Sequence, residues 1–344
     1  MLIDEAHLYP READSMLGTF LEDSEISHVL GITATPIKLQ ANTGLDGERF
    51  SKLVMLTSRS KKGNFFKDIV HVSQVQEMIE LGFWSKLLYK TSGFDSSQLV
   101  YNSSKSEFTE DSMQRAFAAN DMHKQIKQEL DVNSDRKHIL AFVPSIEEAI
   151  QFAQEYPNSA AIYSGMYDSE RERVISEFRK GNIRVIFNVR VLSTGFDYTK
   201  IDCIILGIST ASIALYYQIL GRGTRIDDEK ENCLISDLAG NVDRFGKVED
   251  ITFEKERIWK MYGTDGRLLS GIPIHEIGKV KKGDEEKPIQ QNNSIGKPLD
   301  TMPFGKYKGE SFKDIPKEYR EWMLKSFDWH AANMNLKQAI EGSL

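Results

Sequence analysis

Short apolar runs alternate with charged, amphipathic stretches between about residues 111 and 240. The runs are rich in β-branched and aromatic residues, and we predict that they form buried strands at 139–143, 160–163, 183–187, 202–206 and 232–237. We predict helices between them, at about 112–130, 146–155, 169–180 and 212–220. Strands that alternate with helices in this way favour a parallel sheet covered on both faces. Because ligands bind beyond the carboxyl ends of such strands, we expect the chemistry in the loops that follow them.

Two further strand ends are indicated near the start of the chain. Leu2-Ile3 runs directly into an acidic pair, and the apolar residues 28–32 run into the turn Thr-Ala-Thr-Pro at 33–36. A parallel sheet that is buried on both faces needs more than two strands, and residues 40–90 do not obviously supply them. The predicted fold class is therefore α/β, with one partial and one complete parallel sheet.

The sequence changes character after the last predicted strand. Residues 263–300 are rich in Gly, Lys, Glu, Asn and Pro, which is typical of a linker, and aromatic residues return in 301–344. We therefore predict a partial first domain over 1–90, a complete second domain over 91–262, a linker over 263–300 and a small C-terminal module over 301–344.

Composition narrows the class of protein. The 344 residues include 44 basic and 51 acidic side chains, a formal net charge of −7, and 40% are apolar, which excludes a wholly disordered or fibrous chain. No apolar run approaches the roughly 18 residues of a membrane helix, and the early acidic residues argue against a secretory leader, so we expect a soluble intracellular protein. With only Cys203 and Cys233, neither a disulfide framework nor a four-cysteine zinc site can form. The acidic balance disfavours binding of nucleic acid through bulk charge but leaves a local basic groove open.

Two candidate polar clusters follow the N-terminal strand ends. In the tetrapeptide Asp-Glu-Ala-His at 4–7, one carboxylate could hold Mg²⁺ through water while the second orients or deprotonates an attacking water. Thr33 and Thr35 could bridge neighbouring acids and backbone groups from a tight turn. Each cluster has a simpler alternative, since an acidic pair in a turn is often only solvated and the threonines could belong to an ordinary turn.

Residues 218–225, Gln-Ile-Leu-Gly-Arg-Gly-Thr-Arg, carry the sharpest signal. Arg222 and Arg225 are three residues apart beside small glycines, so both could point into one cleft. Their forked guanidinium groups fit phosphate oxygens, and an arginine directed at a γ-phosphate can contribute roughly 10³–10⁵ in rate. A salt-bridging helix end on the surface is the alternative, but two glycines would weaken such a helix.

The loop at 188–197 directly follows a predicted strand. Thr194 and Gly195 could bind a backbone phosphate through hydroxyl and amide groups, and Asp197 could accept a hydrogen bond from a ribose hydroxyl. The alternative is a plain loop with a glycine turn.

Taken in chain order, these motifs resemble those of DEAH-box superfamily 2 helicases and translocases. In that family, two RecA-like domains clamp ATP between them and move along nucleic acid. The matching segments are 4–7 (motif II), 33–35 (motif III), the strand around Phe142 (motif IV), the nearby turn Ser164-Gly165, 188–197 (motif V) and 218–225 (motif VI). Residues 237–246 are more specifically similar to RadD-type DNA helicases, although the cysteine zinc module of that type has no counterpart here.

The resemblance implies roles in an ATP site. Asp4 would hold Mg²⁺ through water, Glu5 would activate the attacking water, and His7 would couple to Gln218. The two arginines of motif VI would face the γ-phosphate of ATP.

The resemblance also implies roles at the edges of that site. Thr33 and Thr35 would link hydrolysis to movement, and Gly195 and Asp197 would lie beside the nucleotide, where Asp197 would sense it. The residues that would contact the nucleic-acid backbone are Ser164, Gly165 and Thr194.

One departure from the family pattern concerns the phosphate-binding loop. The motif G-x-x-x-x-G-K-[ST] does not occur, because each Gly-Lys pair is followed by Val, Val, Pro or Tyr. The chain also begins inside the motif II strand, so we expect an N-terminally truncated helicase that has only half of its nucleotide site. An upstream fragment that carries the P-loop is a candidate partner.

The C-terminal segment 302–316 resembles a small module of phage and bacterial proteins. Its lysines and aromatic residues could bind single-stranded nucleic acid, or the aromatic residues could simply form a small core. The resemblance as a whole implies the C-terminal part of an ATP- and Mg²⁺-dependent DNA helicase in the cytoplasm of a bacterium or a phage-infected cell. Single-stranded or branched DNA would be its substrate. The alternatives are a non-hydrolysing nucleic-acid-binding or regulatory protein derived from a helicase, or a fragment that needs its P-loop half in trans.

Overall fold

The structure is a computed structural model. It describes residues 1–8, 16–24, 26, 28–44, 47–57, 66–189, 197–279, 301–302, 307, 309–326 and 334–343. The part of the motif V-like loop that contains Thr194 and Gly195 lies outside the described residues.

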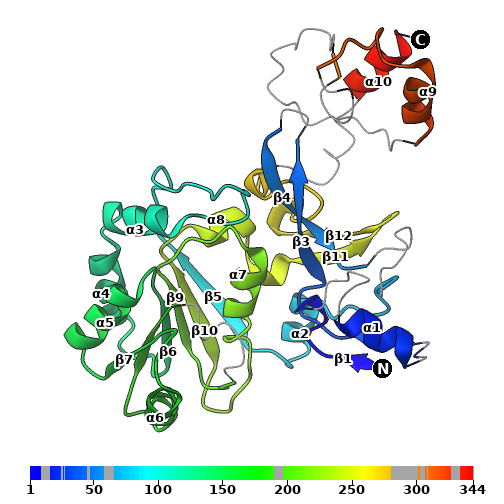
Figure 1. The fold of residues 1–344 in the computed structure, drawn as a ribbon. Coiled ribbons are helices and arrows are strands. Elements are labelled where there is room, and N and C mark those ends of the chain that lie inside the picture. Colours follow the sequence, from blue (N-terminus) through cyan, green and yellow to red (C-terminus); the bar gives the residue numbers. More distant parts are fainter. Residues whose placement is uncertain are drawn as a thin grey trace.

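The centre of the molecule is a six-stranded sheet in which every neighbouring pair of strands is parallel (Figure 1). Its strands, in spatial order, are β5 (Lys86–Thr91), β10 (Asn232–Asp237), β9 (Cys203–Leu206), β6 (Ile139–Phe142), β8 (Val185–Asn188) and β7 (Ser159–Ile162). This confirms the predicted α/β class with one complete RecA-like parallel sheet.

Helices cover both faces of this sheet, as Figure 1 shows. Successive side chains of a strand point to opposite faces, so Ile139 and Ala141 join one apolar cluster while Leu140 and Phe142 join the other. The helices are α3 (Glu110–Ala119), α4 (Met122–Val132), α5 (Ile146–Glu155), α6 (Asp168–Arg179), α7 (Ile213–Leu220) and α8 (Asn241–Phe245).

The single helix predicted over 112–130 is two helices. α3 ends at Ala119, and Asp121 adopts a left-handed conformation with φ 49° before α4 begins. The amide of Asn120 donates to the Ala116 carbonyl at 2.8 Å and to the Asp95 carbonyl at 3.0 Å, which satisfies the end of α3 and fixes the break.

The N-terminal strand ends form a separate two-stranded parallel sheet. β1 (Leu2–Ile3) pairs with β2 (Leu30–Gly31). Between these strands the chain forms the short helix η1 (Ala6–Leu8) and then α1 (Met16–Asp23). A Cβ atom at Gly31 would come within 2.7 Å of the Ala6 Cβ and 2.5 Å of the Phe66 ring, so only glycine allows this approach. The partial first sheet is therefore present as two strands in the described part of the chain.

The elements between residues 37 and 80 that the structure describes contact the chain after residue 250. The antiparallel hairpin β3 (Ile37–Thr43) and β4 (Arg49–Met55) contacts the segment after residue 270, where the Gly271 amide donates to the Leu53 carbonyl at 2.6 Å. Gln74, next to α2 (Val75–Glu80), pairs through its side chain with both backbone groups of Phe253. The boundary predicted at residue 90 falls within β5, which belongs to the six-stranded sheet.

The start of the predicted linker is folded rather than extended. The hairpin β11 (Thr252–Lys255) and β12 (Trp259–Tyr262) leads into short 3₁₀ turns at Thr264–Gly266 and Ile274–Glu276, and a further turn at Val248–Asp250 precedes it. The reason is that 263–279 contributes buried apolar side chains to the core, namely Leu268, Leu269, Ile272, Ile274 and Ile277.

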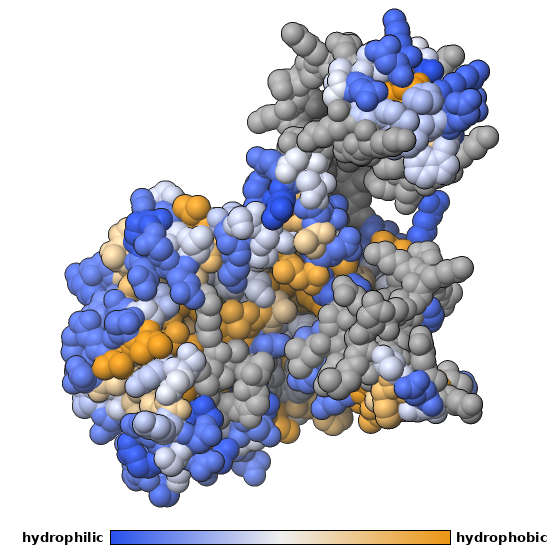
Figure 2. All heavy atoms as spheres, in the orientation of Figure 1, coloured by the Kyte–Doolittle hydropathy of each residue, from blue (hydrophilic) through white to orange (hydrophobic). Residues whose placement is uncertain are grey.

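The C-terminal module has its own apolar cluster, formed around α9 (Lys317–Ser326) and α10 (Met334–Glu341). Figure 2 shows mostly hydrophilic side chains over this module and over the helices of the sheet domain, with an apolar area near the base of the β3–β4 hairpin. Within the described residues, no helix has both the length and the apolar character that crossing a bilayer requires.

Candidate functional site

The loops after β1 and β2 are bound to each other. The Ala6 amide donates to the Ile32 carbonyl at 2.9 Å, and the Ile32 amide donates to the Ile3 carbonyl at 2.8 Å. Glu5 adopts a left-handed conformation with φ 47°, which turns the chain sharply after the strand. The structure thus brings the motif II-like and motif III-like segments together.

His7 makes the side-chain link between these two segments. Its Nδ1 lies 2.8 Å from the Thr33 hydroxyl and 3.3 Å from the Glu5 carboxylate, and the Thr33 hydroxyl accepts from the Thr35 amide at 3.1 Å. The predicted coupling between His7 and Gln218 has no hydrogen bond in the described part of the chain, because the His7 ring is turned toward Thr33.

The arginine-bearing turn is held in place by its own backbone. α7 ends at Leu220, and the Gly223 amide donates back to the Leu220 carbonyl at 2.8 Å. A Cβ atom at Gly223 would lie 2.7 Å from the Cys233 sulfur, so the turn approaches β10 more closely than any other residue type permits. The Ser85 amide donates to the Thr224 carbonyl at 2.6 Å and secures the other end.

Arg225 is paired with Asp197 across the end of the motif V-like loop. The Arg225 Nε lies 2.6 Å from the Asp197 carboxylate, with 30% of the arginine side chain and 77% of the aspartate side chain exposed. The Arg225 Nη1 atom is buried and has no hydrogen-bond acceptor among the described residues. One arm of the guanidinium group is thus anchored while another is available to an anion.

Arg222 connects this turn electrostatically to the N-terminal acids. Burial lowers the pKa of Arg222, and the neighbouring Arg225 lowers it further, whereas Asp197 and Glu5 act in the opposite direction. Glu5 lies in the turn after β1 and Arg222 in the turn after α7, and the two are near enough for Glu5 to influence the pKa of Arg222. Two guanidinium groups and a nearby acidic pair form an arrangement suited to a phosphate group with a divalent cation.

The fit of Mg²⁺ depends on the phosphate. Asp4 is exposed and its Oδ1 accepts from the Glu5 amide at 2.9 Å. Among the residues that the structure describes, no group of three His, Cys, Asp or Glu side chains could hold a metal ion. Since Mg²⁺ is commonly held by one or two carboxylates together with substrate phosphates, Asp4 fits a cation that arrives with a nucleotide.

The predicted nucleic-acid contacts are separate from these clusters. Ser164 and Gly165 are exposed directly after the edge strand β7, and Gly165 has φ 91°. Phe142 is buried in β6 and contributes to the core. Thr194 and Gly195 remain predictions, because they lie outside the described residues.

Residues 237–246 form a buried polar network. The Asp237 carboxylate accepts from the Val242 amide at 2.6 Å and from the Asn241 side chain at 3.1 Å, while the Asn241 Oδ1 accepts from the Thr210 amide. Burial raises the pKa of Asp237. The segment therefore binds the end of β10 to the loop before α7, which carries the arginine turn.

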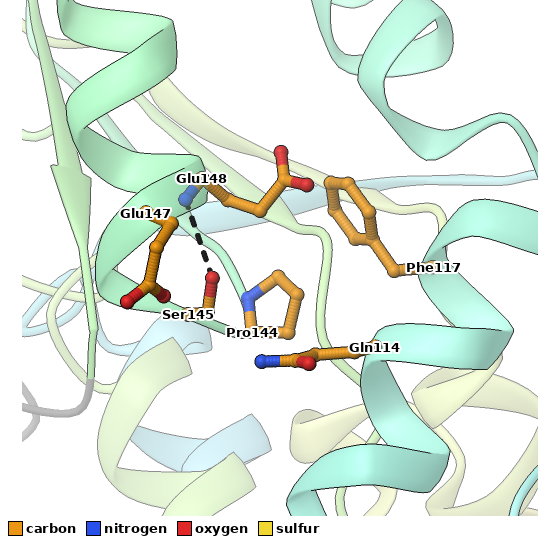
Figure 3. A pocket seen from close by; sticks show the side chains of 6 residues that line it. All are labelled: Gln114, Phe117, Pro144, Ser145, Glu147 and Glu148. Atoms are coloured by element: carbon orange, nitrogen blue, oxygen red, sulfur yellow. Dashed lines mark hydrogen bonds between the residues drawn. The ribbon is translucent and has the colours of Figure 1, made fainter.

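The sequence analysis missed one cavity of about 440 Å³ at the carboxyl end of β6. Figure 3 shows Phe117 and Pro144 around it with the carboxylate of Glu148, while the Glu148 amide donates to the Ser145 hydroxyl at 3.2 Å. Its polar lining includes two glutamates and no basic side chain, so it does not suit a phosphate. No sequence motif marks it, because its residues come from α3, from the loop after β6 and from the first turn of α5.

Comparisons with known families agree with this architecture. Residues 121–227 match the family described as "Helicase conserved C-terminal domain", and residues 298–333 match the family described as "Putative quorum-sensing-regulated virulence factor". The first match covers most of the six-stranded sheet and the arginine turn.

Two yeast relatives match the same region. The chain is 31% identical over 127 residues to "Putative mitochondrial ATP-dependent helicase irc3" of Schizosaccharomyces pombe, covering 36% of this chain and 21% of that protein. It is 35% identical over 83 residues to "Putative ATP-dependent helicase IRC3" of Saccharomyces cerevisiae, covering 24% of this chain and 12% of that protein. The matches thus span about a fifth and an eighth of the lengths of these relatives. Residues 121–227 therefore form a helicase C-terminal domain.

Solved structures align with this chain at low similarity. The type ISP restriction-modification enzyme LlaBIII bound to DNA aligns over 69% of this chain and 18% of its own, with 16% identity and a TM-score of 0.43. A fragment of an HsdR subunit of a type I restriction enzyme from Vibrio vulnificus aligns over 64% of this chain and 41% of its own, with 16% identity and a TM-score of 0.46. Similarity at this level does not assign a function.

Proposed function

We propose that the chain is part of a RadD-like superfamily 2 DNA helicase that couples ATP hydrolysis to movement on DNA. The observation that carries this proposal is that Asp197 pairs with Arg225 at 2.6 Å in the arginine turn, while Glu5 after β1 is near enough to raise the pKa of Arg222 in the same turn. A γ-phosphate bound with Mg²⁺ near these residues would have acidic groups for the cation and arginines for its own negative charge, and phosphoryl transfer requires both.

The roles follow from these positions. Asp4 would hold Mg²⁺ together with the phosphates, and Glu5 would accept the proton of the attacking water. Arg222 and Arg225 would neutralise the charge that develops on the γ-phosphate oxygens. Asp197 would orient Arg225 rather than accept from a ribose, since its carboxylate lies 2.6 Å from the arginine.

The turn that holds Thr33 and Thr35 would connect hydrolysis to movement. His7 joins it to the acidic pair, and the Ile37 amide at the start of β3 donates to the Thr35 carbonyl at 2.7 Å. A change at the acids would therefore reach the β3–β4 hairpin through two short links.

DNA is the proposed nucleic acid, in single-stranded or branched form. One relative, 26% identical over 136 residues, is named "ATP-dependent DNA helicase At3g02060, chloroplastic", from Arabidopsis thaliana. Ser164, Gly165 and Thr194 would contact the DNA backbone through hydroxyl and amide groups. A 28% identical relative from a Lactococcus phage supports a phage or bacterial origin, with the cytoplasm of such a cell as the location.

A second candidate is a DNA-binding or regulatory protein that does not hydrolyse ATP. The observation that favours it is the absence of the motif G-x-x-x-x-G-K-[ST] from the sequence. That motif supplies most phosphate contacts in nucleotide sites of this kind. Without it, the arginines have no positioned phosphate to act on.

One experiment separates the two candidates. ATP hydrolysis with single-stranded DNA would be measured for the chain alone and after addition of a fragment that carries a strand, a P-loop and the following helix. Hydrolysis that appears only in the mixture, and that Glu5→Gln abolishes, supports the helicase proposal. Saturable DNA binding with no hydrolysis in any mixture supports the second candidate.

A further inference from the structure

Lys230 is a buried lysine close to the arginine turn. Only 9% of it is exposed, and its Nζ donates to the Gly223 carbonyl at 2.9 Å and to the Thr199 carbonyl at 3.2 Å. In the described part of the chain, no carboxylate lies within salt-bridge distance of this ammonium group. Its partners are therefore two backbone oxygens from different loops.

These two carbonyls flank the ion pair of the candidate site. Gly223 precedes Arg225 by two residues, and Thr199 follows Asp197 by two residues. The Arg225–Asp197 pair and the Lys230 bridge thus join the same two loops at neighbouring points. The Cys233 side chain packs closely against the arginine turn, because a Cβ atom at Gly223 would lie 2.7 Å from its sulfur.

The surroundings of Lys230 do not favour a charged ammonium group at this position. Burial is the largest influence and lowers the pKa of Lys230; Arg225 lowers it too, while Cys233, Asp202 and Asp227 raise it. Asp227 accepts instead from the Thr199 hydroxyl at 2.5 Å. An apolar side chain would avoid the cost of burying a charge, so the two carbonyl bonds are what the ammonium group provides.

We infer that Lys230 is a positioning residue, which holds the arginine turn against the loop of Asp197 and so orients Arg222 and Arg225 toward a phosphate. The positioning itself rests on the observed bonds, and its use in hydrolysis rests on the proposed function. Loss of the bridge would let the two loops separate and leave two carbonyls without donors.

The test follows the Arg225 side chain by NMR in the full-length protein labelled with ¹⁵N-arginine. Because its Nε lies 2.6 Å from the Asp197 carboxylate, this group should exchange slowly with solvent. Lys230→Met should speed that exchange by about tenfold or more, the scale expected for lost hydrogen bonds to a charged group. Lys230→Arg should restore most of the protection. Lys200→Met is the matched control, since Lys200 pairs with Glu229 in the same loop at 2.7 Å but does not touch the turn.

Two results would overturn the inference. One is an unchanged Arg225 exchange rate in Lys230→Met. The other is an equal loss of protection at the backbone amides of β6 and β10, which would indicate a general loss of stability. If Lys230→Met does not fold, Lys230→Gln, which cannot reach both carbonyls, takes its place with the same expected result.

A titration with tripolyphosphate separates this inference from the proposed function. Shifts of the Arg222 and Arg225 signals in the wild-type protein, reduced in Lys230→Met, are expected if both are correct. If the wild-type signals do not respond to the anion while the exchange effect persists, the phosphate site is wrong and the positioning role stands.

Discussion

The six-stranded sheet and the β1–β2 sheet are both parallel, but they differ in what covers them. Strand residues of the first, such as Ile139, Ile186 and Ile204, are fully buried between two helical layers. In the second, Leu2 is 62% exposed, Leu30 49% and Ile32 52%. The acidic half of the candidate site is therefore attached to a sheet with an uncovered apolar face, and the arginine half to a complete one.

Because of this difference, we expect the arginines to lie on a stable part of the molecule and the acids on a less stable part. The arginines follow a helix that packs on a closed core, whereas the acids follow a two-stranded sheet, which is marginal without further strands. Packing of additional sheet against β1 and β2 would stabilise the acids and assemble the phosphate site in one step. The predictions below test that contrast.

Hydrogen exchange should show the largest contrast. We expect amides of β6 and β10 to exchange at least about 10³-fold more slowly than those of β1 and β2, because local opening needs less free energy where few strands pair. The comparison is made by mass spectrometry on the intact protein. Equal protection of residues 1–40 and 139–237 would contradict the contrast.

A pair of alanine variants converts the contrast into free energies of unfolding. Phe152 is fully buried and stacks on Phe187 with ring centroids 4.7 Å apart. Phe152→Ala should lower the free energy of unfolding by about 3–5 kcal/mol, whereas Leu30→Ala on the exposed face should change it by about 0.5 kcal/mol or less. Urea titration of both variants measures these changes. Similar losses of unfolding free energy in the two variants would contradict the contrast between the sheets.

A glycine variant tests the close approach that sets the arginine turn. Gly223→Ala should destabilise the second domain by about 1–3 kcal/mol, since the added methyl group meets the Cys233 sulfur. The double variant Gly223→Ala with Cys233→Ala should recover much of the loss. Gly93→Ala is the control, because a Cβ atom there has open space. A Gly223→Ala protein as stable as the wild type would show that the turn is looser than described.

Burial of side chains in the core of the six-stranded sheet should also make the free energy of unfolding depend on pH. Burial raises the pKa of the Cys233 thiol from 9.0 to about 12, so the folded state favours the neutral thiol. The stabilisation is complete below pH 9 and is lost as the pH rises toward 12, by about 1 kcal/mol at pH 10. Thermal unfolding between pH 8 and 10.5 measures it, and Cys233→Ala should flatten the curve. Identical slopes for both proteins would argue against a buried thiol.

The sequence was most informative where local pattern and tertiary packing agree. The strands between 139 and 237 could be predicted because runs such as Ile139–Phe142 are uniformly apolar, as strands covered on both faces must be. The break at Asp121 could not, because it depends on Asn120 bonding to a carbonyl 25 residues away. The hairpin β3–β4 packs on a segment more than 200 residues later, and no local pattern reveals that partner.

The candidate site was predictable in its charged residues and not in their partners. The acids and arginines were found through motif spacing, but the bond between His7 and Thr33 and the pair between Arg225 and Asp197 depend on how loops meet. Lys230 was missed because it stands in the run Asp-Asp-Glu-Lys-Glu, which is typical of a solvated surface loop. Its burial follows only from the positions of the Gly223 and Thr199 carbonyls.

The central claim is that acids on the incomplete sheet and arginines on the complete one form a single phosphate site. The most direct test is DNA-stimulated ATP hydrolysis by the chain supplemented with a P-loop fragment. It compares wild type, Arg225→Ala and the matched variant Arg171→Ala in α6, where Arg171 pairs with Asp168. We predict negligible hydrolysis by the chain alone, hydrolysis in the mixture, a loss of roughly 10³-fold or more in Arg225→Ala, and no change in Arg171→Ala. Robust hydrolysis by the chain alone, or hydrolysis in the mixture that Arg225→Ala leaves intact, would contradict the claim.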